Sequence, residues 1–246
     1  MAKINFYSAW YCPFAQRTWT ALEYLGIPYV YKETDPYHKS KRWLKLSRNT
    51  GQVPVLQIVD RKAGQGLPDM SIPGSLRSLE YLDETHEACR SLFPTDHIER
   101  AEARFWLDQQ GADIIPYFYR FLKAEAGSVE ANEAKDKMLE GLLAFTQGMA
   151  ASGPYFFGDE PGVVDFAFAP FALRIEMLLS HYKDYQLPLV DDAWERYVSW
   201  WQAIKYHPSF IASMPEPDSY SAKLIEFYLP YAKGGGQEDV TNTAAS

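Results

Sequence analysis

Residues 8–17, with the sequence SAWYCPFAQR, hold the junction of a predicted strand and a predicted helix, and they place a cysteine at that junction. Before this stretch, residues 3–7 alternate between polar and apolar side chains, as a half-buried strand does. After it, Pro13 stands where the first turn of a helix tolerates proline, and Gly26 follows the last apolar residue at helical spacing. The stretch therefore predicts a strand, then Cys12, then a helix that stops at Gly26.

The rest of the first third also alternates between strands and helices. Further strands are predicted at 29–32, 55–59 and 69–72, and further helices at 40–46 and 75–86. The resulting order is βαβ, then a helix, then ββα. It predicts an α/β domain over residues 1–87.

Strand patterns vanish after a predicted linker at residues 88–97, which contains Pro94. Helices are predicted at 98–126, 129–151, 164–182, 193–204 and 220–231. A mixed α/β region followed by a run of helices implies two domains. The second domain is therefore all-α and spans residues 98–232, and the glycine-rich, polar tail at 233–246 is predicted to be disordered.

Composition and charge limit the function classes. The chain has 24 basic and 32 acidic side chains and a net charge of −8, which argues against nucleic-acid binding because that needs a basic face. Its longest apolar run, residues 166–173, is far shorter than the ~20 residues of a membrane-spanning helix, so no membrane insertion is expected. The two cysteines, Cys12 and Cys89, and an N-terminus without a secretory signal pattern favour a cytoplasmic protein. Neither the cysteines nor the scattered histidines have metal-ligand spacing, so no metal is predicted.

Cys12 is the candidate catalytic residue. Unpaired N–H groups and the positive end of the helix dipole favour a thiolate at a helix start, so the pattern predicts a lowered pKa and a nucleophilic thiol. Arg17, one turn further on, adds a positive charge. The alternative is a buried, inert cysteine. Ala15 stands where a dithiol oxidoreductase has its second cysteine, so a mixed disulfide would need an external thiol, for which glutathione is the candidate.

Two further features suggest a peptide-binding site. A cis bond between Val53 and Pro54 would expose the Val53 backbone to an extended peptide, although most such bonds are trans. Ser75 opens a predicted helix, and a helix N-terminus with a serine hydroxyl binds carboxylates well. Taken alone, Ser75 is better explained as an ordinary helix cap.

Together these motifs resemble the omega class of glutathione S-transferases. The resemblance rests on residues 8–17, on GQVPVL at 51–56, on SLRSLEYLDE at 75–84 and on FFGDEPGVVD at 156–165, and it covers most of residues 3–210. It implies a thioredoxin-like N-terminal domain joined to an all-helical domain, in agreement with the organisation above. It also implies a homodimer and glutathione as co-substrate.

The resemblance assigns roles to residues of the first domain. Cys12 would form a mixed disulfide with glutathione, with Phe14 packed beside it. The backbone at Val53, before Pro54, would pair with the cysteinyl part, and Ser75 would hold the γ-glutamyl carboxylate. Lys39 matches a glutathione-contacting lysine of the family, with Lys41 close by in the sequence.

Two positions depart from the family pattern. Gly74 stands where the family has the glutamate that helps recognise the γ-glutamyl end, so glutathione binding is predicted to be weaker by about tenfold. We expect Gly74→Glu to tighten it, provided that position 74 does not need a positive φ, and Asp69 is a candidate substitute acid. Gly162 replaces the usual Ser or Thr cap three residues before Asp165, which is a milder change.

The sequence thus predicts a glutathione-dependent thioltransferase or reductase that acts through Cys12, with deglutathionylation or dehydroascorbate-type reduction as its reaction. Two alternatives stay open: a transferase that conjugates or cleaves ethers of aromatic substrates, and a non-catalytic carrier of hydrophobic ligands. The second substrate would be hydrophobic or aromatic. Aromatic residues of the second domain could line its pocket or simply fill the core: Tyr117, Phe118, Tyr119, Phe121, Trp200 and Trp201.

Overall fold

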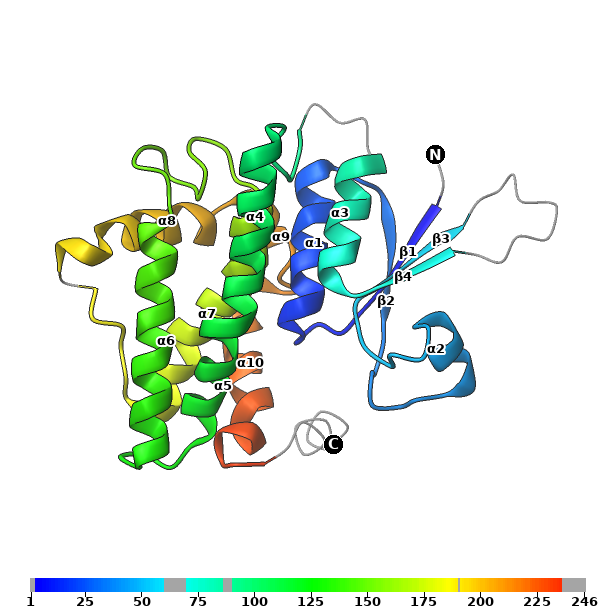
Figure 1. The fold of residues 1–246 in the computed structure, drawn as a ribbon. Helices are drawn as coiled ribbons and strands as arrows, with labels where there is room; N and C mark the ends of the chain where they lie inside the picture. The colour runs from blue at the N-terminus through cyan, green and yellow to red at the C-terminus, as the bar shows by residue number, and fades with distance from the viewer. Residues whose placement is uncertain (1–2, 60–69, 86–89, 190, 236–246) are drawn as a thin grey trace.

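A computed structural model describes residues 3–59, 70–85, 90–189 and 191–235 of the chain. Its N-terminal part contains a four-stranded mixed sheet of strand order β2-β1-β3-β4. The strands are β1 Lys3–Ser8, β2 Tyr29–Glu33, β3 Val55–Val59 and β4 Met70–Pro73, and the helices of this part are α1 Pro13–Leu25, α2 Lys41–Leu46 and α3 Ser75–Thr85. In Figure 1, α1 and α3 lie between the sheet and the helical part of the molecule, and α2 lies on the other side. The thioredoxin-like fold expected from the sequence is confirmed.

The two faces of the sheet bury different clusters because β1 alternates its side chains. Ile4 and Phe6 point toward α1 and α3 and join the large core of the molecule. Tyr7 points the other way, and its ring lies 6.0 Å from that of Trp43 in α2. Strand β1 runs parallel to β2 and antiparallel to β3, so its end brings the following loop to the edge where β3 begins. That edge carries the site.

Both ends of α1 follow the predicted signals. Pro13 occupies the first turn, where a missing N–H costs nothing. Gly26 adopts a left-handed conformation with φ 64°, and its N–H faces the carbonyls of Glu23 and Leu22. The predicted boundaries of this helix are therefore confirmed.

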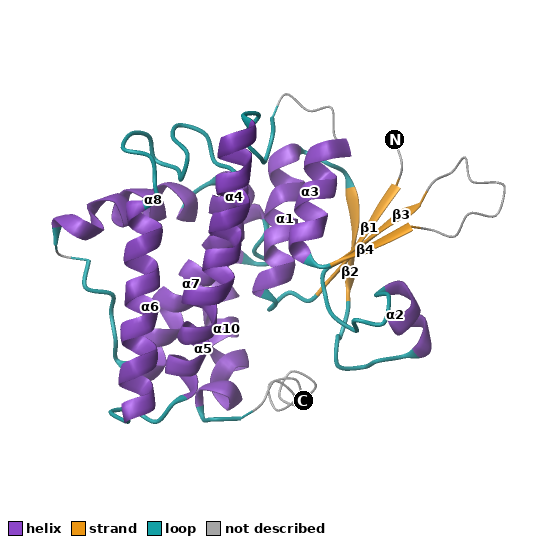
Figure 2. Cartoon of the chain, in the orientation of Figure 1, coloured by secondary structure: helices purple, strands orange, loops and turns teal. Residues whose placement is uncertain are grey.

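The described residues of the C-terminal part form helices joined by loops, with no strand among them (Figure 2). Its elements are α4 His97–Gln109, η1 Gln110–Ile114, α5 Ile115–Lys123, α6 Val129–Gln147, α7 Val163–Lys183, η2 Asp192–Trp194, α8 Glu195–Lys205, α9 Pro208–Ala212 and α10 Pro217–Ala232. Helix α4 begins at His97, the last residue of the predicted linker. The domain boundaries at 87/88 and 97/98 stay predictions, and most of the predicted tail, residues 236–246, lies outside the described residues.

One prediction about these helices was wrong, and one helix was not predicted. Residues 98–126 were expected to form a continuous α-helix, but the π-helical turn η1 interrupts it. The turn lies directly before Pro116, which has no N–H to donate to the preceding turn, so the hydrogen-bond register shifts there. Helix α9 was not expected, because five residues are too few to show a helical period.

Helix α7 runs through the core and is held at its start by Asp165. The carboxylate accepts hydrogen bonds from the backbone N–H groups of Phe156 and Gly162, each at 2.8 Å, and from the indole of Trp200 at 2.7 Å. Burial raises the pKa of Asp165 to about 6, against the effect of these donors. The backbone of Leu92 passes so close that a Cβ on Gly162 would lie 3.0 Å from its carbonyl oxygen, which favours glycine as the cap.

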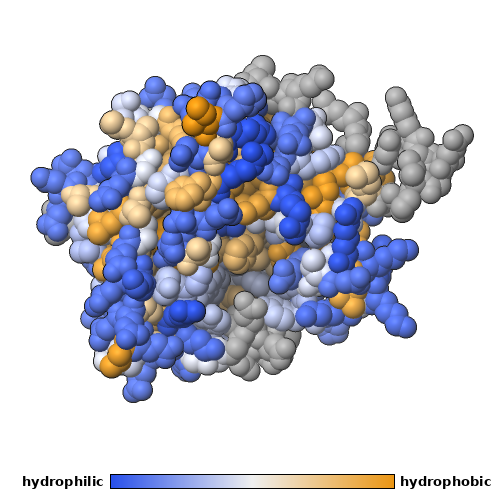
Figure 3. All heavy atoms as spheres, viewed as in Figure 1, coloured by the Kyte–Doolittle hydropathy of each residue, from blue (hydrophilic) through white to orange (hydrophobic). Residues whose placement is uncertain are grey.

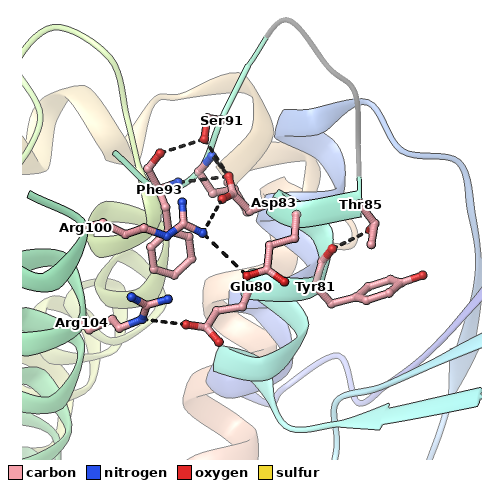
Figure 4. A network of polar contacts seen from close by, with 10 residues as sticks. Glu80, Tyr81, Asp83, Thr85, Ser91, Phe93, Arg100 and Arg104 are labelled. Atoms are coloured by element: carbon pink, nitrogen blue, oxygen red, sulfur yellow. Dashed lines mark hydrogen bonds and ion pairs between the residues drawn. The ribbon is translucent and has the colours of Figure 1, made fainter. Parts of the chain in front are cut away.

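Polar contacts join α3 to α4 (Figure 4). Asp83 accepts hydrogen bonds from the backbone N–H groups of Leu92 and Phe93, at 2.7 and 3.2 Å, and from Arg100 at 3.1 Å. The Arg100 guanidinium also lies 4.8 Å from the ring centre of Phe93. The segment before α4 is thereby held against the first domain. None of the described helices has the length and apolar character needed to cross a membrane.

Candidate functional site

A cavity of about 430 Å³ lies between the sheet domain and the helices α5 and α10. It brings together all six residues that the sequence singled out: Cys12, Phe14, Lys39, Val53, Pro54 and Ser75. These residues come from the α1 start, the α2 approach, the β3 start and the α3 start. Their shared location is a finding, whereas the roles assigned to them stay predictions.

Cys12 caps the N-terminus of α1 in extended conformation, with φ −79° and ψ 116°. Its backbone N–H donates to Ala9 and its carbonyl accepts from Gln16, at 2.9 and 3.0 Å, so the residue is held on both sides. Cys12 is a free, half-buried cysteine. Cys89 lies outside the described residues.

The electrostatics at Cys12 differ from the sequence prediction. Burial raises the pKa of the Cys12 thiol above its ordinary value, although the backbone N–H groups of Ala15 and Phe14 and the cations Arg174 and Arg17 oppose this. The expected lowered pKa is therefore wrong. A helix start is visible in sequence, but the desolvation of the thiol comes from protein atoms packed around it in the folded chain.

A buried arginine of α7, Arg174, hydrogen-bonds to the backbone next to Cys12. Arg174 has no exposed surface, and its guanidinium donates to the Tyr11 carbonyl at 2.7 Å and to the Gln16 side chain at 3.0 Å. It therefore ties the second domain to the residue directly before Cys12. No signal in the sequence marked Arg174, because only the packing of α7 against α1 gives it this position.

Arg17 adds positive charge near Cys12, as the sequence suggested, and it also joins the two domains. Its Nε donates to the Ala167 carbonyl at 2.7 Å, and its guanidinium lies 5.2 Å from the Phe14 ring centre and 4.8 Å from that of Phe171. Burial lowers the pKa of Arg17 to about 10, which leaves it cationic at neutral pH. Arg17 is thus chiefly a domain-joining residue whose charge also acts on Cys12.

The β3 start provides a backbone edge beside the cysteine. The Val53–Pro54 peptide bond is cis, and both residues line the cavity. The Pro54 carbonyl accepts the Gly74 N–H at 2.9 Å, which fixes this edge against the α3 start. The cis bond and the position of Val53 in the cavity lining fit the extended-peptide site that the sequence suggested.

Lys39 lies across Gly51 at one side of the cavity. Gly51 has φ +63°, and a Cβ built on it would lie 3.2 Å from Cε of Lys39. The lysine side chain therefore uses the space that a larger residue would fill. Lys39 lines the cavity and Lys41 does not, which agrees with the choice of Lys39 made from sequence.

The start of α3 departs from what the sequence suggested. Gly74 has φ +92°, and a Cβ built on it would lie 2.6 Å from Nη2 of Arg77, whose Nε donates to the Pro73 carbonyl at 2.7 Å. The condition set for Gly74→Glu is not met, because L-residues rarely adopt this conformation. Gly74→Glu is therefore not expected to tighten glutathione binding. Asp69 lies outside the described residues.

Aromatic side chains form the opposite wall. Tyr11 stacks on Phe227 of α10 at 4.0 Å between ring centres, and the hydroxyls of Tyr119 and Tyr228 are 3.4 Å apart. Tyr231 completes this wall. Of the aromatic residues proposed from sequence, Tyr119 lines the cavity, whereas Phe118 and Trp200 are fully buried in the core. The aromatic residues of α10 carried no signal beyond helical spacing.

The described residues contain no group of three or more histidine, cysteine, aspartate or glutamate side chains arranged to hold a metal ion. The polar groups that line the cavity are thiol, hydroxyl, amide, ammonium and guanidinium. They can bind an anionic peptide-like ligand and present a thiol to it.

Comparison with known proteins places the chain in a family. Residues 11–85 match the glutathione S-transferase N-terminal domain, and residues 98–203 match the C-terminal domain. A probable glutathione S-transferase of Nicotiana tabacum is 34% identical over 170 residues, which cover 68% of this chain and 69% of the relative.

Solved structures agree with this assignment. Glutathione transferase Omega 3C from Trametes versicolor is 28% identical with a TM-score of 0.76, covering 99% of this chain and 92% of its own. A Tau class enzyme from Mangifera indica, at 24% identity, shares the fold with a TM-score of 0.72 over 90% of this chain and 98% of its own. The neighbours thus come from both classes, and the omega class expected from sequence is not confirmed. With both domain models matched and a relative above 30% identity, the chain belongs to the glutathione S-transferase family.

Proposed function

We propose that this protein is a glutathione-dependent thioltransferase in which Cys12 forms a mixed disulfide with glutathione. The observation that carries this proposal is the position of a free thiol at the α1 start, inside the cavity that also holds Val53, Lys39 and Ser75. Ala15 offers no second thiol one turn away. The reaction would then be deglutathionylation or a related glutathione-dependent reduction, such as that of dehydroascorbate.

The proposed cycle has two exchange steps. The Cys12 thiolate attacks the glutathionyl sulfur of a mixed disulfide, a new S–S bond forms, and the substrate thiolate leaves and takes a proton from water. A second glutathione thiolate then attacks the glutathionyl sulfur on Cys12. This step releases glutathione disulfide and regenerates the Cys12 thiolate. The net reaction converts one mixed disulfide and one glutathione into the free substrate thiol and glutathione disulfide, and the proton lost by the glutathione thiol balances the proton taken up by the substrate.

Each of the other residues has a binding role in this proposal. The Val53 backbone, preceding Pro54, pairs with the cysteinyl part of glutathione, and Ser75 with the α3 N–H groups holds a carboxylate. Lys39 holds the other carboxylate, and Phe14, 40% exposed, packs beside the sulfur atoms. Glutathione is thereby laid along the first domain with its thiol at Cys12.

A second candidate is a transferase that conjugates glutathione to aromatic electrophiles, with ether cleavage as a variant. The raised pKa of the Cys12 thiol favours it, because a neutral thiol can donate a hydrogen bond to the glutathione thiolate. The aromatic wall formed by Tyr119, Phe227 and Tyr228 supports it as well, since an apolar substrate would pack there.

A pair of assays on Cys12→Ser separates the candidates, with Cys89→Ser as the matched control. The first assay follows glutathione disulfide released from the mixed disulfide of glutathione and 2-mercaptoethanol, and the second follows conjugation of chlorodinitrobenzene. We expect Cys12→Ser to abolish thiol transfer, because a serine hydroxyl cannot form the mixed disulfide. Transfer that survives in Cys12→Ser, or is absent from the unmodified protein, would refute the thioltransferase. Conjugation that persists in Cys12→Ser would support the second candidate.

We also propose that the protein is a cytoplasmic homodimer. Three exposed apolar side chains, Met70 at 62%, Ile98 at 75% and Phe105 at 50%, lie on β4 and α4. Figure 3 shows scattered apolar surface among predominantly hydrophilic atoms on the face drawn in Figure 1. Light scattering should give twice the chain mass of 28.2 kDa at micromolar concentration, and a stable monomer mass would contradict the dimer.

A further inference from the structure

Basic side chains gather on α2 and directly after it, in a chain whose net charge is −8. Positions 36–59 contain no acidic residue, and the acid that precedes them, Asp35, lies 3.6 Å from Nδ1 of His38. Four exposed residues form what we call the basic surface: Lys41, Arg42, Lys45 and Arg48. None of the four forms an ion pair with any residue that the structure describes.

The charges of the basic surface work against the helix that carries them. Lys41 and Lys45 are four residues apart, so they share one face of α2 and repel each other. The first turn of α2 has no acidic residue, although cations at this end of a helix oppose its dipole. The helix is held to the sheet by Trp43, its one buried residue, which packs against Tyr7. The cations therefore point away from this contact, and an anionic partner would relieve their repulsion.

The basic surface adjoins the mouth of the cavity. Lys39 comes directly before it in the chain, and Thr50 and Gln52 follow it. All three residues line the cavity and are also exposed, so the cavity opens to solvent at this segment. The chain thus leaves the cavity lining at Lys39, carries the cations past the opening, and returns to the lining at Thr50.

The shape and surroundings of the basic surface favour a short acidic segment of a protein over two other anionic partners. A membrane surface is disfavoured because the exposed large apolar side chains of the described residues lie on other segments, which leaves no apolar anchor here. A nucleic acid is disfavoured because Trp43 is buried and cannot stack on a base, and because the rest of the chain is strongly negative and would repel a long polyanion. The six residues of α2 span only about 9 Å, the length of a few residues of extended peptide.

We propose that the basic surface docks an acidic segment of a protein whose glutathionylated cysteine enters the cavity. The inference rests on the proposed function and names its substrate class: glutathionylated proteins with aspartate or glutamate near the modified cysteine. The exchange of disulfide bonds at Cys12 is unchanged by the docking. Because the added contacts are the same before and during the exchange, they lower KM and leave kcat as it is.

Two matched peptides test the docking on the full chain. Both carry one cysteine in a mixed disulfide with glutathione, and they differ only in having glutamates or glutamines on either side of it. At low salt we expect kcat/KM for release of glutathione disulfide to be about three- to tenfold higher for the acidic peptide, the size expected for a few exposed ion pairs. Raising the ionic strength should remove most of this preference.

A double variant assigns the preference to the basic surface. Lys41→Gln/Lys45→Gln should bring the two peptides to nearly equal kcat/KM. Its turnover of the small mixed disulfide of glutathione and 2-mercaptoethanol should stay unchanged, which checks that the fold and the thiol chemistry are intact. Lys135→Gln/Lys137→Gln makes the same charge change on α6, at the opposite end of the molecule from α2 (Figure 1), and should keep the preference.

The remaining outcomes separate the docking from the proposed function. Equal kcat/KM for both peptides with the unmodified protein, or a preference that survives Lys41→Gln/Lys45→Gln or is lost equally in the α6 variant, would overturn the docking and leave the proposed function standing. Cosedimentation with phosphatidylserine vesicles that needs Lys41 and Lys45, without a peptide preference, would overturn it in favour of a membrane. No turnover of the small disulfide or of either peptide would overturn both.

Discussion

The two walls of the cavity are built by different means. The first-domain wall consists of helix starts, a cis peptide edge and two left-handed glycines, and most of its groups act through the backbone. The wall opposite consists of aromatic side chains from α5 and α10, including Tyr119, Phe227 and Tyr228. Backbone features are encoded by short local motifs, whereas an aromatic wall exists only once distant helices pack together.

This difference suggests that the two walls bind different parts of the substrates. In the proposed function, a backbone edge with two cations would recognise a peptide of defined charge and length. An aromatic surface accepts apolar groups of many shapes, because stacking makes few directional demands. Glutathione-like ligands should therefore depend on the first wall and the second substrate on the other, and changes to each wall should have separable effects.

The largest effect is expected on the free energy of unfolding, at Arg174, which joins the two walls. Arg174→Met removes the charged donor of the Tyr11 carbonyl and leaves space in the core, so we expect a loss of about 2–4 kcal/mol in the free energy of unfolding. Urea unfolding measures this loss. The exposed Arg42→Met should change stability by less than about 0.5 kcal/mol. A fully stable Arg174→Met protein would mean that the walls are held together without this contact.

The next effect concerns the pH dependence of the thiol on the first wall. Because burial raises the pKa of Cys12, its alkylation by iodoacetamide in a Cys89→Ser background should rise about tenfold per pH unit and continue beyond pH ~8.5. The free energy of unfolding should depend on pH as well. The neutral buried thiol stabilises the fold at low pH, and this contribution is lost as the pH rises through the raised pKa. A plateau of the alkylation rate below pH 8 would contradict the direction.

A smaller effect separates two neighbouring lysines of the first wall. Lys39→Ala should weaken glutathione binding roughly fivefold, as for loss of one exposed charge-assisted contact, while Lys41→Ala should not. Calorimetry on each variant measures the change. An equal loss of glutathione affinity in both variants would show that binding depends on the total charge of the segment and not on the position of Lys39 across Gly51.

The smallest effect is expected on the aromatic wall. Tyr228→Phe removes a hydroxyl that lies 3.4 Å from that of Tyr119 but keeps the ring, so the KM for an aromatic electrophile should change by no more than about threefold. The Kd for glutathione should stay the same. A large change in glutathione affinity from this variant would show that the two walls do not act separately.

Local sequence predicted much of the first domain. Pro13 and Gly26 mark the ends of α1 because each has a backbone property that depends on its own chemistry. Cys12 at the helix start follows from the same kind of signal, whereas the sequence left the cis Val53–Pro54 bond open, and the structure brings both into one cavity. Such features need only a few neighbouring residues, so a single sequence is enough to find them.

Tertiary structure decided what those residues can do. The pKa of Cys12 moves opposite to the local prediction because desolvation depends on everything packed around the thiol. Arg77 lies across Gly74, and Arg174 reaches Tyr11, through side-chain directions and helix packing that no spacing reveals. The sequence by itself therefore determined the family of folds and several of the residues that line the cavity. Contacts between residues far apart in the chain decided the charge of the cavity, its aromatic wall and the ionisation of its thiol. At Cys12, burial outweighs the local effect of the helix start.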